Sequence, residues 1–139
     1  MATHNDLGKR GEEIAQGFLE AKGYNILDVN YRFKRFEVDI VALQLEPAEL
    51  VFIEVKTRSS QKHSYPEESV DQSKRKRMFR AADSYIYEKQ MRTVPVRFDI
   101  VAISMDNPEH PMIHHIEDAF RMTDDIGLQG MEGLGMGDF

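Results

Sequence analysis

Two short segments of this chain carry charged side chains inside otherwise apolar stretches. The segment VFIEVKT contains Glu54 and Lys56 two residues apart, and the segment FEVDIVA contains Asp39 between two apolar residues. Residues two apart in an extended strand lie on the same face, so Glu54 and Lys56 should point the same way. A carboxylate near the interior of a sheet is costly without a partner, which makes Asp39 the most informative of the three.

These residue types suit the hydrolysis of a phosphodiester bond. The reaction needs charge stabilisation at phosphorus and a nucleophile made from water, and Mg²⁺ or Mn²⁺ bound by carboxylates supplies both. Asp39 and Glu54, with the backbone carbonyl of Val55, form the expected metal-binding set. Lys56 would orient the attacking water or stabilise the transition state. Glu12, from a helix edge, would complete the set directly or through water.

A structural interpretation exists for each of these residues. An E-x-K pattern on a strand is common, Asp39 and Lys56 could form a buried ion pair, and Glu12 could be a solvated helix residue. A polar brace of this kind should bind no Mn²⁺. The histidines show no ligand spacing beyond one adjacent pair, which indicates surface or strand positions: His63, His110, His114 and His115.

The elements that would position these residues follow from local periodicity. A helix is predicted over 6–22, with Asn5 or Asp6 as its cap, and its period places Glu12 at the edge of an apolar stripe but Glu13 in solvent. A second helix is predicted at 71–90, and strands are predicted at 25–33, 36–45, 50–57, 94–104 and 112–116. Because the strands carry apolar residues on both faces, we expect an α/β fold with helices covering both sides of the sheet.

The connection between the second and third strands decides whether the charged residues meet. A four-residue loop, EPAE at 46–49, would place Val41 opposite Glu54 and Asp39 opposite Lys56. Directly opposed residues share a face, so this register gathers the three charged side chains at one end of the sheet. A slip of one residue would move them to opposite faces.

Composition indicates one soluble domain. The chain has 139 residues, of which 41% are hydrophobic and 30% charged, and no run approaches the length of a membrane span. The first residues carry charges where a signal peptide has an apolar core, and the absence of cysteine excludes disulfides and thiolate metal sites. We therefore expect a cytoplasmic protein without a membrane partner, with residues 1–120 forming the domain and 121–139 a flexible, acidic, Gly/Met-rich tail.

The net charge of −6 taken alone argues against a nucleic-acid-binding protein. Its distribution changes that argument, because 117–139 hold six acidic residues against one arginine, a net of −5, which leaves −1 for the rest. Local basic clusters predict contacts with a phosphate backbone. The residues predicted to bind nucleic acid, with DNA as the expected partner, are Lys34, Arg35, Arg58, Lys76, Arg77 and Arg80. A homodimer or a protein partner stays open.

Five segments together resemble a known family. In chain order they are GKRGEEIAQGFLEAKGYNILDVNYR, FEVDIVA, VFIEVKTRSS, VRFDIVAI and HIEDAF, within residues 8–120. They look like the YraN-type predicted endonucleases of the restriction-endonuclease-like, PD-(D/E)xK superfamily, related to Holliday-junction resolvases. The resemblance implies a mixed β-sheet flanked by helices. By matched position, Asp39 is the motif aspartate, Glu54 and Lys56 form the E-x-K, and Glu12 is the glutamate of G-E-x-x-A.

The chain departs from the family pattern at three points. Phe36 replaces a usual glycine, Val38 replaces an isoleucine, and the loop HSYP lacks the glycine of F-G-x-P. None of these is a proposed ligand. The first hypothesis is a metal-dependent endonuclease acting on DNA, including branched or recombination and repair intermediates. The alternative is a non-catalytic nucleic-acid-binding or adaptor module that retains the nuclease fold.

Overall fold

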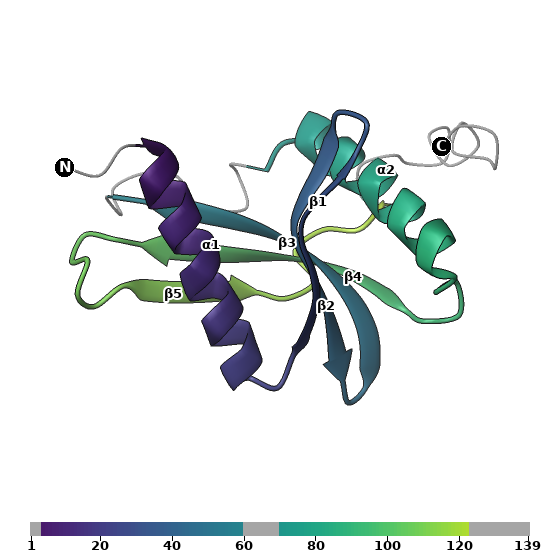
Figure 1. Ribbon diagram of the computed structural model, residues 1–139, viewed down its shortest axis with the longest axis horizontal. Helices are drawn as coiled ribbons and strands as arrows, with labels where there is room; N and C mark the ends of the chain where they lie inside the picture. Colours follow the sequence, from purple (N-terminus) through teal and green to yellow (C-terminus); the bar gives the residue numbers. More distant parts are fainter. Residues whose placement is uncertain (1–3, 60–69, 123–139) are drawn as a thin grey trace.

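The computed structural model describes residues 4–59 and 70–122. Its elements in chain order are α1 (His4–Ala21), β1 (Asn25–Phe33), β2 (Phe36–Leu45), β3 (Ala48–Arg58), α2 (Gln72–Lys89), β4 (Val96–Ser104) and β5 (Met112–Ile116) (Figure 1). Each bound lies within about two residues of the predicted range. Because α1 begins at His4, the predicted caps Asn5 and Asp6 lie inside the helix. Neither of these helices is long and apolar enough to cross a membrane.

The strands form one mixed sheet in the order β1-β2-β3-β4-β5. The first three strands pair antiparallel, β3 and β4 pair parallel, and β4 and β5 pair antiparallel. A parallel pair needs a crossover connection, and α2 lies within the one that joins β3 to β4. The expected α/β architecture, a mixed sheet flanked by helices, is confirmed and is consistent with a restriction-endonuclease-like domain.

Each face of the sheet packs against one helix. Figure 1 shows α1 lying across the sheet and α2 beside the β1–β2 hairpin. Beneath α2 the core is aromatic, with Phe52, Phe79 and Phe98 stacked or edge-to-face. Beneath α1 it is mainly aliphatic, with Leu19 and Ile53 fully buried. This coverage of both faces explains why the strands carry apolar residues at successive positions.

The β2–β3 register differs from the predicted one by two residues. The turn holds only Glu46 and Pro47, and the ladder runs from Leu45–Ala48 to Ile40–Ile53. Ala48 and Glu49, expected in the loop, belong to β3, and the Glu49 carboxylate accepts hydrogen bonds from Gln44 of β2 and Arg97 of β4.

A register shift of two residues does not by itself move a side chain to the other face of the sheet. Val41 pairs with Phe52, where the prediction set Glu54. Continuing the ladder by one pair brings Asp39 across from Glu54, where the prediction set Lys56. The two carboxylates are therefore closer partners than the predicted register implied.

Helix α1 lies against β3 at Gly11. A Cβ atom at this position would lie 1.8 Å from the Oγ1 of Thr57, a contact that no side chain can make. Glycine at this point therefore lets the helix backbone lie against the end of β3. The next residue, Glu12, is half-buried, whereas Glu13 is exposed, as the helical period predicted.

Two sequence-based expectations fall on residues that the structure does not describe. The polar loop that contains His63 and the HSYP segment lies within 60–69, and the predicted acidic tail lies almost wholly beyond Met122. Up to that point the chain packs on the core, since Phe120 is buried and Met122 contacts the cluster beneath α2.

Candidate active site

At Asp39, the apolar side chains of β2 switch from one face of the sheet to the other. Val38 packs in the cluster beneath α2, whereas Ile40, two residues further, packs beneath α1, so strict alternation is interrupted between them. Asp39 itself is 8% exposed. Its Oδ2 accepts a hydrogen bond from the backbone N–H of Val55 at 2.8 Å, which directs the carboxylate toward β3.

Glu54 presents a buried carboxylate between two lysines. The residue is 4% exposed. Its Oε2 lies 3.4 Å from the Nζ of Lys56, and its Oε1 lies 3.5 Å from the Nζ of Lys74. Although it is buried, Oε1 forms no hydrogen bond within the described part of the chain. A buried oxygen without a hydrogen bond is costly, and here the Lys74 ammonium at 3.5 Å compensates its charge only. This atom therefore keeps an unused acceptor position for a ligand.

Lys74 is the site residue that sequence reasoning missed. It lies in the first turn of α2, where the Asp71 side chain caps the helix by accepting a hydrogen bond from the Lys74 backbone N–H at 2.9 Å. The cap was readable from the sequence, because aspartate before a helical pattern is a common start signal. Nothing local to the sequence places that turn beside Glu54, which is 20 residues earlier.

The site carries more negative charge than its surroundings favour. Burial raises the pKa of Asp39 well above its usual range, repulsion by Glu54 raises it further, and the Val55 N–H opposes both. Burial also raises the pKa of Glu12, partly offset by a hydrogen bond from the Asn30 side chain. A bound divalent cation would relieve this repulsion by stabilising the ionised carboxylates.

The raised pKa of Asp39 predicts a pH-dependent cost to folding. The folded protein keeps a proton on Asp39 that the unfolded chain releases above pH 3.8. The free energy of unfolding that depends on this proton is therefore fully present below pH 3.8 and is lost as the pH rises through the folded-state pKa. In EDTA, Asp39→Asn should therefore be more stable than wild type at pH 8.5, by ~1–3 kcal/mol, with the difference shrinking toward pH 5.

Urea unfolding of the two proteins at both pH values measures this difference. The matched control is Asp106→Asn, since Asp106 is exposed in the β4–β5 connection. For each variant, the quantity compared is its free energy of unfolding relative to wild type. If this difference grows no more for Asp39→Asn than for Asp106→Asn between pH 5 and pH 8.5, Asp39 is already ionised in the metal-free protein and the electrostatic description of the site is wrong.

The predicted metal ligands do not all lie equally close to one another. Asp39 and Glu54 adjoin across β2 and β3, and Val55 contacts Asp39 through its N–H. In an extended strand the N–H and C=O of one residue face the same neighbouring strand, so the Val55 carbonyl is also turned to that side. Glu12 lies within electrostatic range of both carboxylates and is held by Asn30. Among the described residues, Glu12, Asp39 and Glu54 do not bring three oxygens within 4.8 Å of one another.

The residues predicted to bind nucleic acid fall in three places. Lys34 and Arg35 form the exposed turn between β1 and β2, and Arg80 reaches this hairpin from α2, 5.6 Å from the centre of the Phe36 ring. Lys76 and Arg77 are exposed on the first half of α2. Arg58 is at the end of β3, away from these two groups. Their contact with nucleic acid stays a prediction.

A second group of potential metal ligands lies elsewhere on the sheet. Asp99, His115 and Glu117 bring three ligand atoms within 4.8 Å of one another. His115 thus has a buried partner, Asp99, at 2.7 Å, which the expectation of a surface or strand histidine did not include. The positively charged Arg97 occupies the same place: its Nη2 lies 2.8 Å from Asp99 and 3.4 Å from Glu117.

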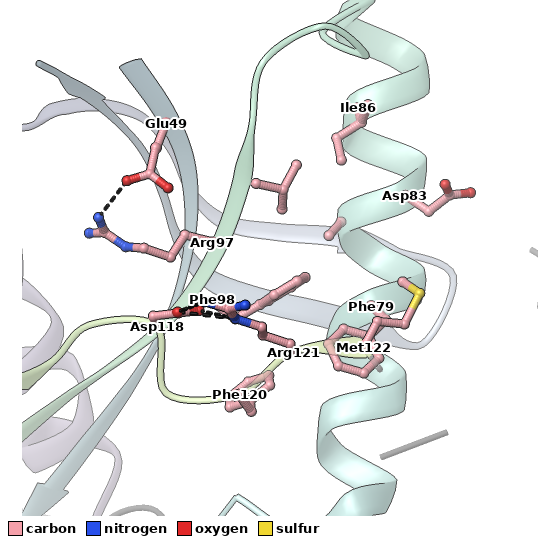
Figure 2. A pocket seen from close by; sticks show the side chains of 12 residues that line it. Glu49, Phe79, Asp83, Ile86, Arg97, Phe98, Asp118, Phe120, Arg121 and Met122 are labelled. Carbon is pink, nitrogen blue, oxygen red and sulfur yellow. Dashed lines mark hydrogen bonds and ion pairs between the residues drawn. The ribbon is translucent and has the colours of Figure 1, made fainter. Parts of the chain in front are cut away.

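Asp99 is fully hydrogen-bonded without a metal. Although burial raises its pKa, hydrogen bonds from His115, Arg97 and the Asp118 N–H bring that pKa below the usual range. Arg97 also donates to Tyr24 at 2.6 Å. It donates to Glu49 at 3.0 Å as well (Figure 2). A cation would have to displace the guanidinium from this network, so we interpret the group as a structural ion-pair network.

The cavity drawn in Figure 2 is separate from the Asp39–Glu54 site. It has a volume of about 490 Å³ and lies between α2, β4 and residues 118–122, with Phe79, Phe98 and Phe120 among its lining residues. Neither Asp39 nor Glu54 lines it. The carboxylates, not this cavity, therefore define the candidate active site.

Comparison with known proteins identifies the family of this chain. Residues 11–103 match the model of "Uncharacterised protein family UPF0102". A UPF0102 protein of Bacteroides thetaiotaomicron is 49% identical over 120 residues, covering 86% of this chain and 96% of that protein. A UPF0102 protein of Christiangramia forsetii is 42% identical over 120 residues, covering 86% and 98% of the two chains. The chain therefore belongs to the UPF0102 family.

Proposed function

We propose that this protein is a metal-dependent endonuclease that hydrolyses phosphodiester bonds in DNA, including branched or recombination and repair intermediates. One observation carries the proposal: the buried Glu54 carboxylate, with one oxygen that forms no hydrogen bond, adjoins Asp39 and lies between two lysines. A polar brace would satisfy its buried oxygens internally. A site for a divalent cation leaves an oxygen with an unused acceptor position, as Oε1 has here, although the Lys74 ammonium lies 3.5 Å from it.

The donor set fits Mg²⁺ or Mn²⁺. Both cations prefer hard oxygen ligands and retain several waters, so one or two carboxylates suffice to hold them. Asp39 and Glu54 would bind the cation, with the Val55 carbonyl as a third oxygen and Glu12 acting through water. When bound, the cation would polarise the phosphoryl oxygens and favour deprotonation of the attacking water.

The chain's own residues would orient the reactants. The Lys56 side chain is 29% exposed and its Nζ lies 3.4 Å from Glu54. It can donate to the attacking water or to a phosphoryl oxygen. Lys74 holds the other Glu54 oxygen from α2 and would keep that carboxylate in position. Water attacks phosphorus, the bond from phosphorus to the leaving sugar oxygen breaks, and that oxygen takes up a proton.

Cleavage assays test this proposal directly. Linear, flapped and four-way DNA are incubated with the protein and Mg²⁺ or Mn²⁺, at low ionic strength because phosphate contacts weaken as salt rises. We expect metal-dependent cleavage of at least one substrate by wild type and none in EDTA. Absence of cleavage of all three with either metal would contradict the enzyme and favour the non-catalytic binding module.

Calorimetric titration with Mn²⁺ shows where the metal binds. Asp39→Asn should weaken Mn²⁺ binding by about tenfold or more, since it removes one charged ligand, whereas His115→Gln should leave it within about twofold. The opposite pattern would place the metal at Asp99, His115 and Glu117, and would contradict the assignment to Asp39 and Glu54.

A further inference from the structure

A groove of about 800 Å³ lies between the β1–β2 hairpin and α2. Its walls combine aromatic and cationic side chains from the two elements, and those used in the argument are Phe33, Phe36, Tyr87, Lys34, Arg80 and Arg92. Tyr87 is 70% exposed, which is unusual for a large side chain on a helix that otherwise packs on the core. The groove thus exposes the Tyr87 ring, whereas Phe33 is half-buried and Phe36 is buried beneath it.

Three cationic side chains of this groove lie over aromatic rings that also line it. The Nζ of Lys34 lies 5.3 Å from the centre of the Phe33 ring, and the guanidinium of Arg92 lies 5.3 Å from the centre of the Tyr87 ring. Arg80 lies 5.6 Å from the centre of the Phe36 ring. Each pair places a positive charge beside a flat apolar surface.

The two walls are held at a fixed separation. The hydroxyl of Tyr31, on β1, forms a 2.9 Å hydrogen bond with the Ser84 hydroxyl of α2, and its ring meets the Tyr85 ring edge-on at 5.0 Å. The hairpin cannot move away from α2 without breaking these contacts. A preformed groove loses less entropy when a ligand binds.

The groove and the candidate active site lie on the same side of the sheet, the side that α2 covers. Phe36 is three residues from Asp39 along β2, a distance of about 10 Å in an extended strand. Arg80 is six residues after Lys74, about 9 Å along α2. A nucleic-acid strand a few nucleotides long could therefore lie in the groove and reach Glu54.

We infer that this groove binds single-stranded nucleic acid and stacks unpaired bases on Tyr87 and Phe33, so that the substrate of the proposed endonuclease has an unpaired segment beside the cleavage site. This inference rests on the proposed function and adds the form of its substrate. Aromatic faces stack on every base, and adjacent cations hold the phosphates.

Asp83 favours nucleic acid over an acidic peptide as the ligand. This exposed carboxylate lines the same groove, and it would repel the side chains of an acidic peptide. It can accept hydrogen bonds from the amino groups of bases. A nucleic-acid strand can therefore use all three kinds of side chain in the groove. Its bases stack on the aromatic rings and donate to Asp83, and its phosphates bind the cations.

Fluorescence anisotropy in EDTA tests the inference without any cleavage. The probes are a labelled 15-nucleotide oligothymidylate and a 15-base-pair duplex, with unlabelled polyglutamate as competitor. We expect Tyr87→Ala to weaken binding of the single strand by about tenfold, and to change duplex binding by less than about twofold. Tyr87→Phe, which keeps the ring, should retain wild-type affinity.

Matched controls separate stacking from general effects of substitution. Met112→Ala removes another exposed large apolar side chain, on β5, and should change neither affinity. Arg92→Gln tests the cation beside Tyr87, and Lys9→Gln on α1 is its control. We expect Arg92→Gln to weaken single-strand binding at least threefold more than Lys9→Gln does. A 5-iododeoxyuridine oligonucleotide should crosslink to Tyr87 or Phe33.

The outcomes distinguish the two proposals. Single-strand binding that is unchanged in Tyr87→Ala, or that polyglutamate displaces as readily as unlabelled oligothymidylate, would overturn the groove inference whether or not DNA is cleaved. Tyr87-dependent binding without cleavage under any metal would retain the groove and overturn the endonuclease.

Discussion

Replacing Lys56 by methionine is expected to lower the rate of DNA cleavage by about 10²–10⁴-fold. Methionine keeps the length of the side chain and removes its charge and its hydrogen-bond donors. Lys56 is the only proposed catalytic residue that is cationic, and its Nζ lies 3.4 Å from Glu54. Charge that develops on the phosphate would therefore lose its nearest donor from β3.

Single-turnover cleavage with saturating Mg²⁺ measures this loss, because it separates chemistry from product release. Mn²⁺ affinity should stay within about threefold of wild type, since a lysine is not a ligand and its removal leaves the carboxylates in place. Lys9→Met, an exposed lysine on α1, is the control. A Lys56→Met protein that cleaves within threefold of Lys9→Met would show that Lys56 has no part in the reaction.

Replacing Arg97 by methionine is expected to lower the free energy of unfolding by ~3–5 kcal/mol, because it leaves a buried charge without its partner. The Arg97 side chain is 9% exposed and that of Asp99 is fully buried. Two hydrogen bonds join them, from Nε at 2.9 Å and Nη2 at 2.8 Å. Among the residues that the structure describes, Asp99 would then keep His115 and the Asp118 N–H as its donors.

Urea denaturation followed by circular dichroism measures this change. The control is Arg121→Met, which breaks an exposed ion pair with Asp118 and should cost less than about 1 kcal/mol. The double variant Arg97→Met/Asp99→Leu should recover much of the loss, because it removes the unpaired carboxylate as well. Equal losses in Arg97→Met and Arg121→Met would contradict a buried network at this position.

The sequence alone was sufficient for the elements and for the faces of the charged residues. Period-2 alternation put Glu54 and Lys56 on one face, and the helical period separated half-buried Glu12 from exposed Glu13. These inferences depend only on residues a few positions apart. Both survive in the structure, because regular backbone geometry sets the direction of a side chain before any tertiary contact forms.

Pairing between strands could be predicted only in part. The prediction for β2 and β3 had the correct faces and a register wrong by two residues, because the ends of a hairpin loop depend on side chains outside it. Glu49 belongs to β3, where Arg97, 48 residues further along, donates to it. No local pattern contains that partner.

The candidate site, too, was predictable from the sequence only in part. Residue types and spacing identified Asp39, Glu54 and Lys56, but burial of Asp39, the approach of Lys74 to Glu54 and the pairing of His115 with Asp99 arise from tertiary packing. Periodicity predicts the direction in which a side chain points from its own helix or strand. The groups that this side chain contacts, and the shift of its pKa, depend on elements distant in the chain that pack against it.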